Sequence, residues 1–232
     1  NETKNAIPNI LSDALSVSFD QQIGHDYFTD ADERFDFYHR VEHKIPFDLD
    51  MFNKITNGGV PNKTLNVILA GTGVGKSLFM CHHAANCYDA NLNVLYITCE
   101  MAEERIAERI DANLMDVTMD ELRHLPKIAY DRKLSKATGS IKSRLIVKEY
   151  PTATANVNHF RHLLDELKLK KNFQPDVIFI DYLNICSSAR FKQGGNVNSY
   201  MYIKSIAEEL RGLAVERDVP IFTATQTNRT GF

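Results

Sequence analysis

The sequence predicts an α/β fold in which a mostly parallel sheet is covered by helices on both faces. Five short apolar, β-rich runs alternate with amphipathic helical patterns, which is the order expected of parallel strands joined by crossover helices. A glycine-rich turn lies between the first of these runs and the next helix. With 232 residues, 44% hydrophobic and 25% charged, the chain can bury a core without metal or disulfide support.

Residues 1–44 are expected to form a linker helix and connector, and residues 45–232 the main domain. Apolar residues recur at four-residue steps from Pro8 to Phe19, which predicts an amphipathic helix. This helix is either a packed or frayed terminus or an arm that docks on a neighbouring subunit. Residues 20–44 are rich in acids and aromatics without a regular apolar period. We expect a surface connector there, whose aromatics dock on the main body.

After the turn cluster at residues 57–61, strands and helices are expected in regular alternation. The expected strands are Leu65–Leu69, Val94–Thr98, Arg144–Glu149, Asp176–Ile180 and Val219–Thr225. Helical patterns cover 76–89, 102–113 and 118–125, and two longer ones run through 160–167 and 203–214. Thr118 and Glu121 have the spacing of a capping box.

Composition excludes several classes of protein. The chain has 27 Lys and Arg against 30 Asp and Glu, a net charge of −3, so its whole surface is not a nonspecific polyanion binder. No apolar stretch approaches the ~18 residues of a membrane-spanning helix, so we expect a soluble, cytoplasmic protein without a membrane partner. The four cysteines show no framework spacing, which favours reduced thiols.

The glycine-rich turn has the pattern of a phosphate-binding loop between a strand and a helix. Inward-facing backbone N–H groups and the positive end of the next helix favour phosphate there. We expect Lys76 to contact the β- and γ-phosphates and Ser77 to bind Mg²⁺. The alternative is a glycine-rich turn without a ligand. The expected nucleotide-binding residues are Ala70 (where the stricter pattern has Gly), Gly71, Thr72, Gly73, Val74, Gly75, Lys76 and Ser77.

Polar residues follow three other strands. Asp181 ends an apolar run and is expected to hold the magnesium shell, the alternative being a helix-capping aspartate. Glu100 follows the second strand and is expected to be the general base for the attacking water. In the rival interpretation it belongs to the acidic first turn of the next helix, with Glu103 and Glu104. Gln226 follows the last strand, where an amide can sense the γ-phosphate.

Two weaker signals lie outside these motifs. Arg190 and Lys192 stand in a long polar stretch after the Asp181 strand, where they are expected to contact a single-stranded nucleic-acid backbone. The alternative is a disordered surface loop. A cysteine and histidine cluster suggests a metal, but it lies on the helix after the phosphate loop without a second ligand pair, which favours a packed helix. That cluster consists of Cys81, His82, His83 and Cys87.

Four motifs, taken in their order along the chain, resemble those of a known protein family. The chain resembles the RecA-fold motor of DnaB-like replicative helicases, including those of T-even bacteriophages. The resemblance covers nearly the whole chain, from the lead-in at 47–59 onward. The four motifs are 70–77, Thr98–Met101, Ile180–Leu183 and Thr225–Arg229.

The resemblance implies a RecA-like P-loop NTPase fold that hydrolyses ATP or GTP with Mg²⁺. It places the catalytic glutamate at Glu100, the magnesium aspartate at Asp181 and the γ-phosphate glutamine at Gln226. It further implies a homo-hexameric ring around single-stranded DNA that moves 5′ to 3′ and unwinds duplex at the replication fork. Primase and a helicase loader are implied partners, and the host cell cytoplasm is the implied location for a phage protein. The leading helix would be the linker that docks on the adjacent subunit.

The chain begins with Asn rather than Met, which indicates a cut point within a longer protein. It ends six residues after Gln226, so we expect the family's later DNA-binding loop, its arginine finger and its N-terminal domain to lie outside it. An arginine finger contributes ~10³–10⁵ in rate, so this chain is expected to bind nucleotide, hydrolyse it poorly and fail to unwind DNA. A RecA-like recombinase ATPase and a nucleotide-gated scaffold with slow hydrolysis are the alternative functions.

Overall fold

The computed structural model describes residues 26–39, 43–191 and 198–226, and the chain divides after residue 42 into two compact units. The described part of the first unit contains helix α2 (Ala31–His39). The Asp26 carboxylate accepts hydrogen bonds from the backbone N–H groups of Phe28 and Thr29 in the turn before this helix. Acids in its first turn and His39 in its last turn complement the helix dipole.

The sequence did not predict helix α2 within the expected connector. The helix buries none of its residues, so no apolar stripe marks it in the sequence, and its charged ends are the signal that was missed. The expected docking of the connector aromatics stays a prediction. The leading helix expected at Pro8–Phe19 lies outside the described residues.

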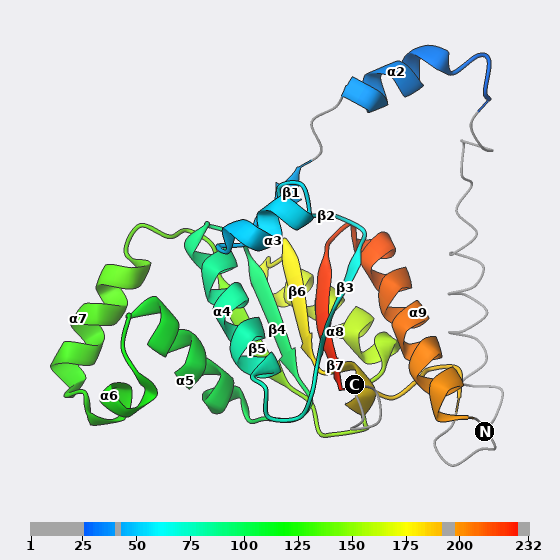
Figure 1. Ribbon diagram of the computed structural model, residues 1–232. Coiled ribbons are helices and arrows are strands. Elements are labelled where there is room, and N and C mark those ends of the chain that lie inside the picture. The colour runs from blue at the N-terminus through cyan, green and yellow to red at the C-terminus, as the bar shows by residue number, and fades with distance from the viewer. Residues whose placement is uncertain (1–25, 40–42, 192–197, 227–232) are drawn as a thin grey trace. The chain divides into compact units, whose positions relative to one another are not determined.

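The second unit is built around a five-stranded parallel sheet (Figure 1). The strand order across the sheet is β3-β7-β6-β4-β5. All five predicted strands are confirmed, with ends that move by no more than two residues. Their bounds are β3 (Leu65–Ala70), β4 (Val94–Thr98), β5 (Leu145–Glu149), β6 (Val177–Asp181) and β7 (Ile221–Gln226).

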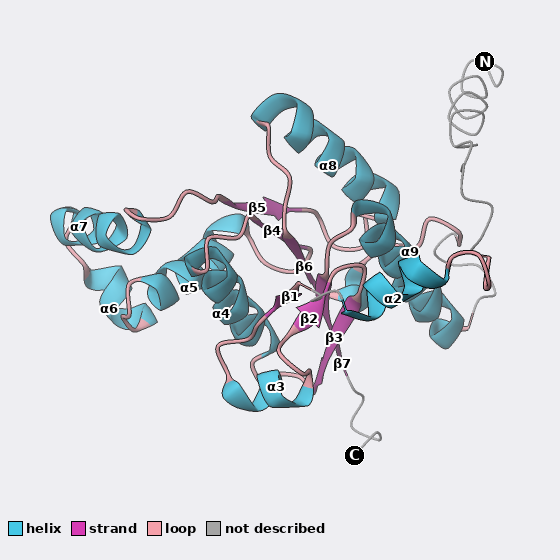
Figure 2. Cartoon of the chain, turned by 90° about the horizontal axis from the view of Figure 1, so that it is seen from above, coloured by secondary structure: helices cyan, strands magenta, loops and turns pink. Residues whose placement is uncertain are grey.

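Helices cover both faces of this sheet, as the sequence predicted (Figure 2). Apolar residues of α4 (Lys76–Asp89) and α5 (Glu103–Leu114) form one core with Tyr96 and Phe179, and those of α8 (Val157–Lys171) and α9 (Ser199–Arg217) form the other with Leu95 and Ile178. Successive residues of β4 and β6 therefore enter opposite cores, because neighbouring side chains of a strand point to opposite faces. The resulting three layers are the predicted α/β architecture.

Several smaller elements complete the second unit. Helix α6 (Met119–His124) begins with the predicted capping box, in which Thr118 and Glu121 bond each other's backbone N–H groups. The sequence did not predict α3, α7 or the 3₁₀ turn η1. Neither α3 nor α7 buries a residue, so neither has an apolar stripe. The bounds are α3 (Asp50–Ile55), α7 (Lys127–Thr138) and η1 (Leu183–Ile185), and a two-stranded antiparallel ribbon pairs β1 (Lys44–Ile45) with β2 (Val60–Pro61).

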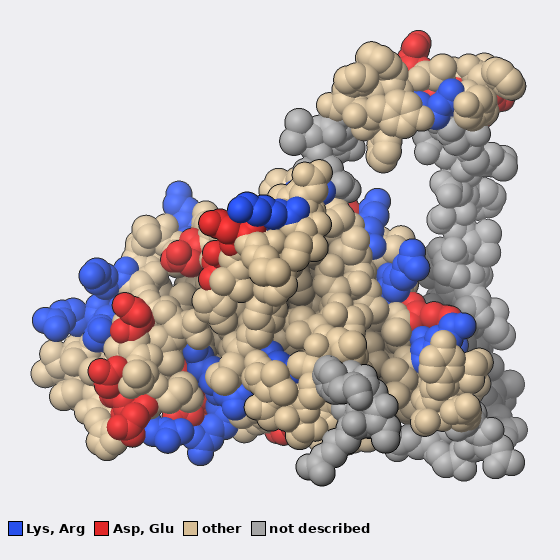
Figure 3. All heavy atoms as spheres, viewed as in Figure 1, with Lys and Arg blue, Asp and Glu red and all other residues tan. Residues whose placement is uncertain are grey.

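The surface agrees with the near-neutral composition. On the face drawn in Figure 3, basic and acidic side chains are interspersed. In the part of the chain that the structure describes, no helix is both long enough and apolar enough to cross a bilayer.

Candidate functional site

The register of the sheet brings the predicted site residues to one edge. Ala70, the last residue of β3, lies opposite Gln226, the last residue of β7. Thr98, the last residue of β4, lies opposite Asp181, the last residue of β6. Because all these strands run parallel, the loops that follow them emerge at the same carboxyl edge, where open α/β sheets bind ligands.

The phosphate loop joins β3 to α4. Gly73 and Gly75 have φ values of 76° and 104°, a left-handed conformation that residues with a side chain rarely adopt. The loop therefore turns its backbone inward at the start of α4, which is the geometry of an anion nest. Lys76, the first residue of α4, is only 9% exposed, and its Nζ lies 3.4 Å from the carbonyl oxygen of Gly71. Thr72 and Val74 at the tip are exposed.

Asp181 is completely buried behind this loop. Its Oδ2 accepts a hydrogen bond of 3.0 Å from the Tyr96 hydroxyl, while its Oδ1 has no hydrogen-bond partner among the residues that the structure describes. Burial raises the pKa of Asp181, and this rise is opposed by the hydroxyls of Ser77 and Tyr96 and by the charges of Arg109 and Lys76. Neither oxygen caps a helix, so the alternative of a helix-capping aspartate is wrong. A free carboxylate oxygen close to the Ser77 hydroxyl is a donor set that suits Mg²⁺.

Glu100 lies exposed in the loop between β4 and α5. Helix α5 begins at Glu103, so the rival interpretation of Glu100 as part of its first turn is wrong. The backbone of the loop is fixed by a 2.8 Å hydrogen bond from Cys99 N to Asp181 O and by Thr98 Oγ1, which bonds both backbone groups of Met101. The Glu100 and Asp181 charges both contribute to the raised pKa of Tyr182, in which burial dominates. Glu100 therefore lies close to Tyr182, whose ring centroid is 5.7 Å from Lys76 Nζ.

Gln226 is partly buried at the end of β7. The residue before it, Thr225, donates a 2.7 Å hydrogen bond from its hydroxyl to Asn184 Oδ1 in η1. This contact joins the strand that carries Gln226 to the segment that directly follows Asp181.

Two residues near Asp181 were missed by the sequence interpretation. Tyr96 is fully buried and bonds Asp181 from the neighbouring strand. Burial raises the pKa values of both Asp181 and Cys81, and the charge of Arg109 on α5 opposes both rises, an effect that acts over a few ångströms. Tyr96 lies two residues before Thr98 on β4, so the two side chains share one face of the sheet, which is a usable signal. Nothing local distinguishes Arg109 from Arg105, the other arginine of its helix.

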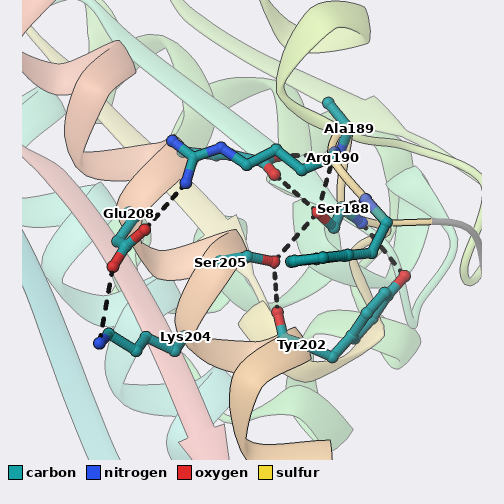
Figure 4. A network of polar contacts seen from close by, with 9 residues as sticks. Ser188, Ala189, Arg190, Tyr202, Lys204, Ser205 and Glu208 are labelled. Atoms are coloured by element: carbon teal, nitrogen blue, oxygen red, sulfur yellow. Dashed lines mark hydrogen bonds and ion pairs between the residues drawn. The ribbon is translucent and has the colours of Figure 1, made fainter. Parts of the chain in front are cut away.

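The weaker sequence signals have different outcomes. Arg190 Nη1 forms an ion pair of 2.9 Å with Glu208 on α9 (Figure 4), and Lys192 lies outside the described residues. The packed-helix interpretation of the cysteine and histidine cluster is confirmed for Cys81, His83 and Cys87, which are buried. Within the described ranges, no group of three or more metal-ligating side chains is assembled.

Comparison with known proteins gives consistent matches. Residues 45–231 match the family model of the DnaB-like helicase C terminal domain. The chain is 49% identical to the DnaB-like replicative helicase of Enterobacteria phage T4, over 97% of this chain and 48% of that protein. It is 27% identical to the replicative DNA helicase DnaB of Synechocystis, over 79% of this chain and 20% of that protein. The chain thus spans about half the length of its phage relative and about a fifth of the length of the bacterial one.

Solved structures show the same fold. A DnaB-like replicative helicase, solved with its interactions with primase, matches with a TM-score of 0.71 and 20% identity, over 99% of this chain and 55% of that one. A second solved structure, of an ATPase domain, matches with a TM-score of 0.69 and 20% identity, over 88% of this chain and 73% of that one.

Proposed function

The chain belongs to the DnaB-like helicase C-terminal domain family, and from this premise we propose that it is the NTP-hydrolysing motor of a ring-shaped replicative DNA helicase. The motor hydrolyses ATP or GTP, moves 5′ to 3′ on single-stranded DNA and unwinds duplex at the replication fork. The observation that carries this proposal is the convergence of the phosphate loop, Asp181, Glu100 and Gln226 on one sheet edge.

The phosphate loop binds the triphosphate. Its backbone N–H groups and the N-terminal end of α4 favour the negative charge of the phosphates. Lys76 lies over the loop and supplies a positive charge to the β- and γ-phosphates. Because this ammonium is largely buried, its attraction to phosphate is stronger than that of a solvated lysine.

Ser77 and Asp181 are the residues that would hold Mg²⁺, through a hydroxyl and through the free Oδ1. When bound, the ion supplies positive charge that neutralises the phosphate oxygens during transfer. Tyr96 orients the aspartate by bonding its other oxygen.

Glu100 acts as the general base. Its exposed carboxylate stands at the edge where the γ-phosphate lies, and it accepts a proton from the attacking water. Gln226 senses the γ-phosphate through its amide. The hydrogen bond between Thr225 and Asn184 connects this sensor to the segment after Asp181.

The assembly follows from the family. We propose a homo-hexamer around single-stranded DNA, with residues 1–44 as the linker that docks on the adjacent subunit and residues 45–232 as the motor. Arg190 and Lys192 contact the DNA. The interactions with primase of the structural relative support primase as a partner, and a helicase loader is proposed with it. The location that follows is the cytoplasm of the host cell.

The test is NTP hydrolysis by the full-length protein with and without single-stranded DNA, for the wild type, Lys76→Ala and Glu100→Gln. We expect DNA to stimulate turnover, both substitutions to abolish it, and Glu100→Gln to retain nucleotide binding. Turnover that ignores DNA and survives Glu100→Gln would favour the nucleotide-gated scaffold instead.

A further inference from the structure

The chain that follows β6 and η1 is tied to helix α9 by one buried carboxylate. Glu209 of α9 is only 7% exposed. Its Oε1 accepts a 2.6 Å hydrogen bond from the Ser188 hydroxyl, and its Oε2 accepts a 2.9 Å hydrogen bond from the backbone N–H of Ala189. Both carboxylate oxygens therefore bind the same short segment.

Ser188 in turn binds the backbone of the residues that follow it. Its Oγ accepts hydrogen bonds from the backbone N–H groups of Arg190 and Phe191, at 3.1 and 3.3 Å. Its own N–H donates to the Tyr202 hydroxyl of α9 at 3.1 Å, and the Ser205 hydroxyl lies 3.0 Å from Ser188 Oγ (Figure 4). The backbone from Ser188 to Phe191 is thus held by a single network centred on the Ser188–Glu209 pair.

The Glu209 carboxylate is bonded by neutral groups of this segment. Among the described residues, its hydrogen-bond partners are a hydroxyl and an amide, and none is a cation. A buried carboxylate without a cation is costly unless its oxygens are well bonded. The hydrogen bonds from the Ser188 hydroxyl and the Ala189 N–H supply this bonding. Loss of either bond would leave a carboxylate oxygen buried without a partner, which favours the bonded conformation of the segment.

Glu208, the residue before Glu209, binds the side chain of Arg190 and not the backbone of the segment. Glu208 is about half exposed, and its Oε2 pairs with the Arg190 guanidinium at 2.9 Å. Lys204 lies 3.9 Å from its other oxygen. Glu208 therefore competes with an incoming phosphate for Arg190, whereas Glu209 holds the backbone that carries Arg190. A cavity of about 390 Å³, lined by Ala153, Ser187–Phe191 and Tyr202, opens beside this segment.

We propose that Glu209 is a positioning residue for the binding of single-stranded DNA. It holds Ser188–Phe191 in the conformation that presents Arg190 to the nucleic-acid backbone. This inference rests on the proposed function, in which Arg190 contacts DNA. The segment also follows η1 along the chain, and Thr225 links η1 to the Gln226 strand, so one short stretch of chain joins Ser188–Phe191 to the nucleotide site.

The sign of the effect of one substitution separates positioning from bulk electrostatics. Removing an acid near a polyanion should strengthen binding if only charge matters. Glu209→Gln replaces one acceptor oxygen by an NH₂ group that cannot accept a hydrogen bond. We therefore expect it to weaken DNA binding, and we expect Glu208→Gln, the matched control one position away, to strengthen it.

The experiment measures the affinity of the 232-residue chain for fluorescent oligo(dT) by anisotropy at fixed salt, together with its affinity for a fluorescent ATP analogue. We expect Glu209→Gln and Ser188→Ala each to weaken oligo(dT) binding about fivefold or more, and the double variant to add little, because both break one network. Binding of the ATP analogue should change less than about twofold.

Other outcomes overturn the inference in distinct ways. If the wild-type chain binds oligo(dT) and Glu209→Gln binds it equally or more tightly, Glu209 has no positioning role. Loss of ATP-analogue binding in parallel with DNA binding shows a structural role only. If the wild type itself fails to bind oligo(dT), the DNA contact in the proposed function falls, and the role of Glu209 falls with it.

Discussion

Asp181 shows how a single residue acquires a role from its surroundings. Its carboxylate is removed from water, bonded at one oxygen by Tyr96 and left free at the other. Burial alone disfavours the ionised form, and nearby hydroxyls and cations restore part of the balance. The positive charge around Asp181 is therefore part of the site, and Arg109 contributes to it from a different element.

Arg109 offers a prediction at this scale. We expect Arg109→Ala to slow DNA-stimulated NTP hydrolysis about tenfold or more, because it removes a cation near the proposed phosphate-binding site, where positive charge stabilises the transferring phosphate. Turnover by the full-length protein is the measurement. Arg105→Ala is the matched control, since Arg105 lies on the same helix but is 61% exposed and pairs with Glu108. Equal effects of the two substitutions would contradict a specific role.

His83 makes stability depend on pH. It is buried among aromatic rings, its Nδ1 has no hydrogen-bond partner in the described part of the chain, and burial lowers its pKa to about 4. The unfolded chain takes up this proton near the ordinary pKa of about 6.5, and the folded chain takes it up only near 4. The free energy of unfolding is therefore unaffected by His83 protonation above a pH of about 6.5. It falls by about 3 kcal/mol at most as the pH is lowered toward about 4.

Urea unfolding at successive pH values checks this prediction. The free energy of unfolding of His83→Leu should fall less steeply between pH values of about 6.5 and about 4 than that of the wild type. His82→Gln serves as the control, because the His82 ring nitrogens donate hydrogen bonds to Asn113 Oδ1 and Asp48 Oδ2, and these bonds raise the pKa of His82, which opposes the trend. Parallel curves for wild type and His83→Leu would show that His83 is not the titrating group.

At the scale of elements, strong local signals located the helices and strands correctly. Helix α4 follows a glycine loop, α6 has a capping box, and β4 and β6 are continuous apolar runs buried on both faces. Helices α3 and α7 lack such signals because they bury no residue. An element that lies on the surface leaves little periodicity in the sequence.

The capping box of α6 can be tested by one substitution. Thr118→Ala removes the side-chain acceptor for Glu121 N and should lower the free energy of unfolding by about 1 kcal/mol. Chemical denaturation is the measurement. Thr138→Ala is the control, because the Thr138 hydroxyl only bonds back to Leu134 O within α7, and its loss should have a much smaller effect. A Thr118→Ala variant as stable as the wild type would show that the box contributes nothing.

At the scale of the whole molecule, the parallel sheet is what makes a site out of separate motifs. Residues that are far apart in the chain, such as Ala70 and Gln226, become direct neighbours by register. A ligand bound at this edge contacts several strand ends at once, so its binding should stabilise the second unit as a whole.

Thermal unfolding with nucleotide measures this coupling. ADP with Mg²⁺ at about 100 times its Kd should stabilise the folded state by about 2.7 kcal/mol, which corresponds to a rise in Tm of roughly 5–10 °C for a protein of this size. Chelation of Mg²⁺ should reduce the rise, and Lys76→Ala should abolish it. An unchanged Tm for the wild type would argue against a nucleotide site at this edge.

The sequence by itself determined the strands, the main helices, the phosphate loop and the polar residues at the strand ends, because these depend on local periodicity and on short motifs. The roles of Glu100, Asp181 and Gln226 stay predictions, although the structure excludes the rival structural interpretations for the two acids. Only the tertiary structure decided that Tyr96 bonds Asp181, 85 positions along the chain, and that Glu209 bonds Ser188, 21 positions away. Such contacts depend on how elements pack in space, and packing brings together residues that no local pattern connects.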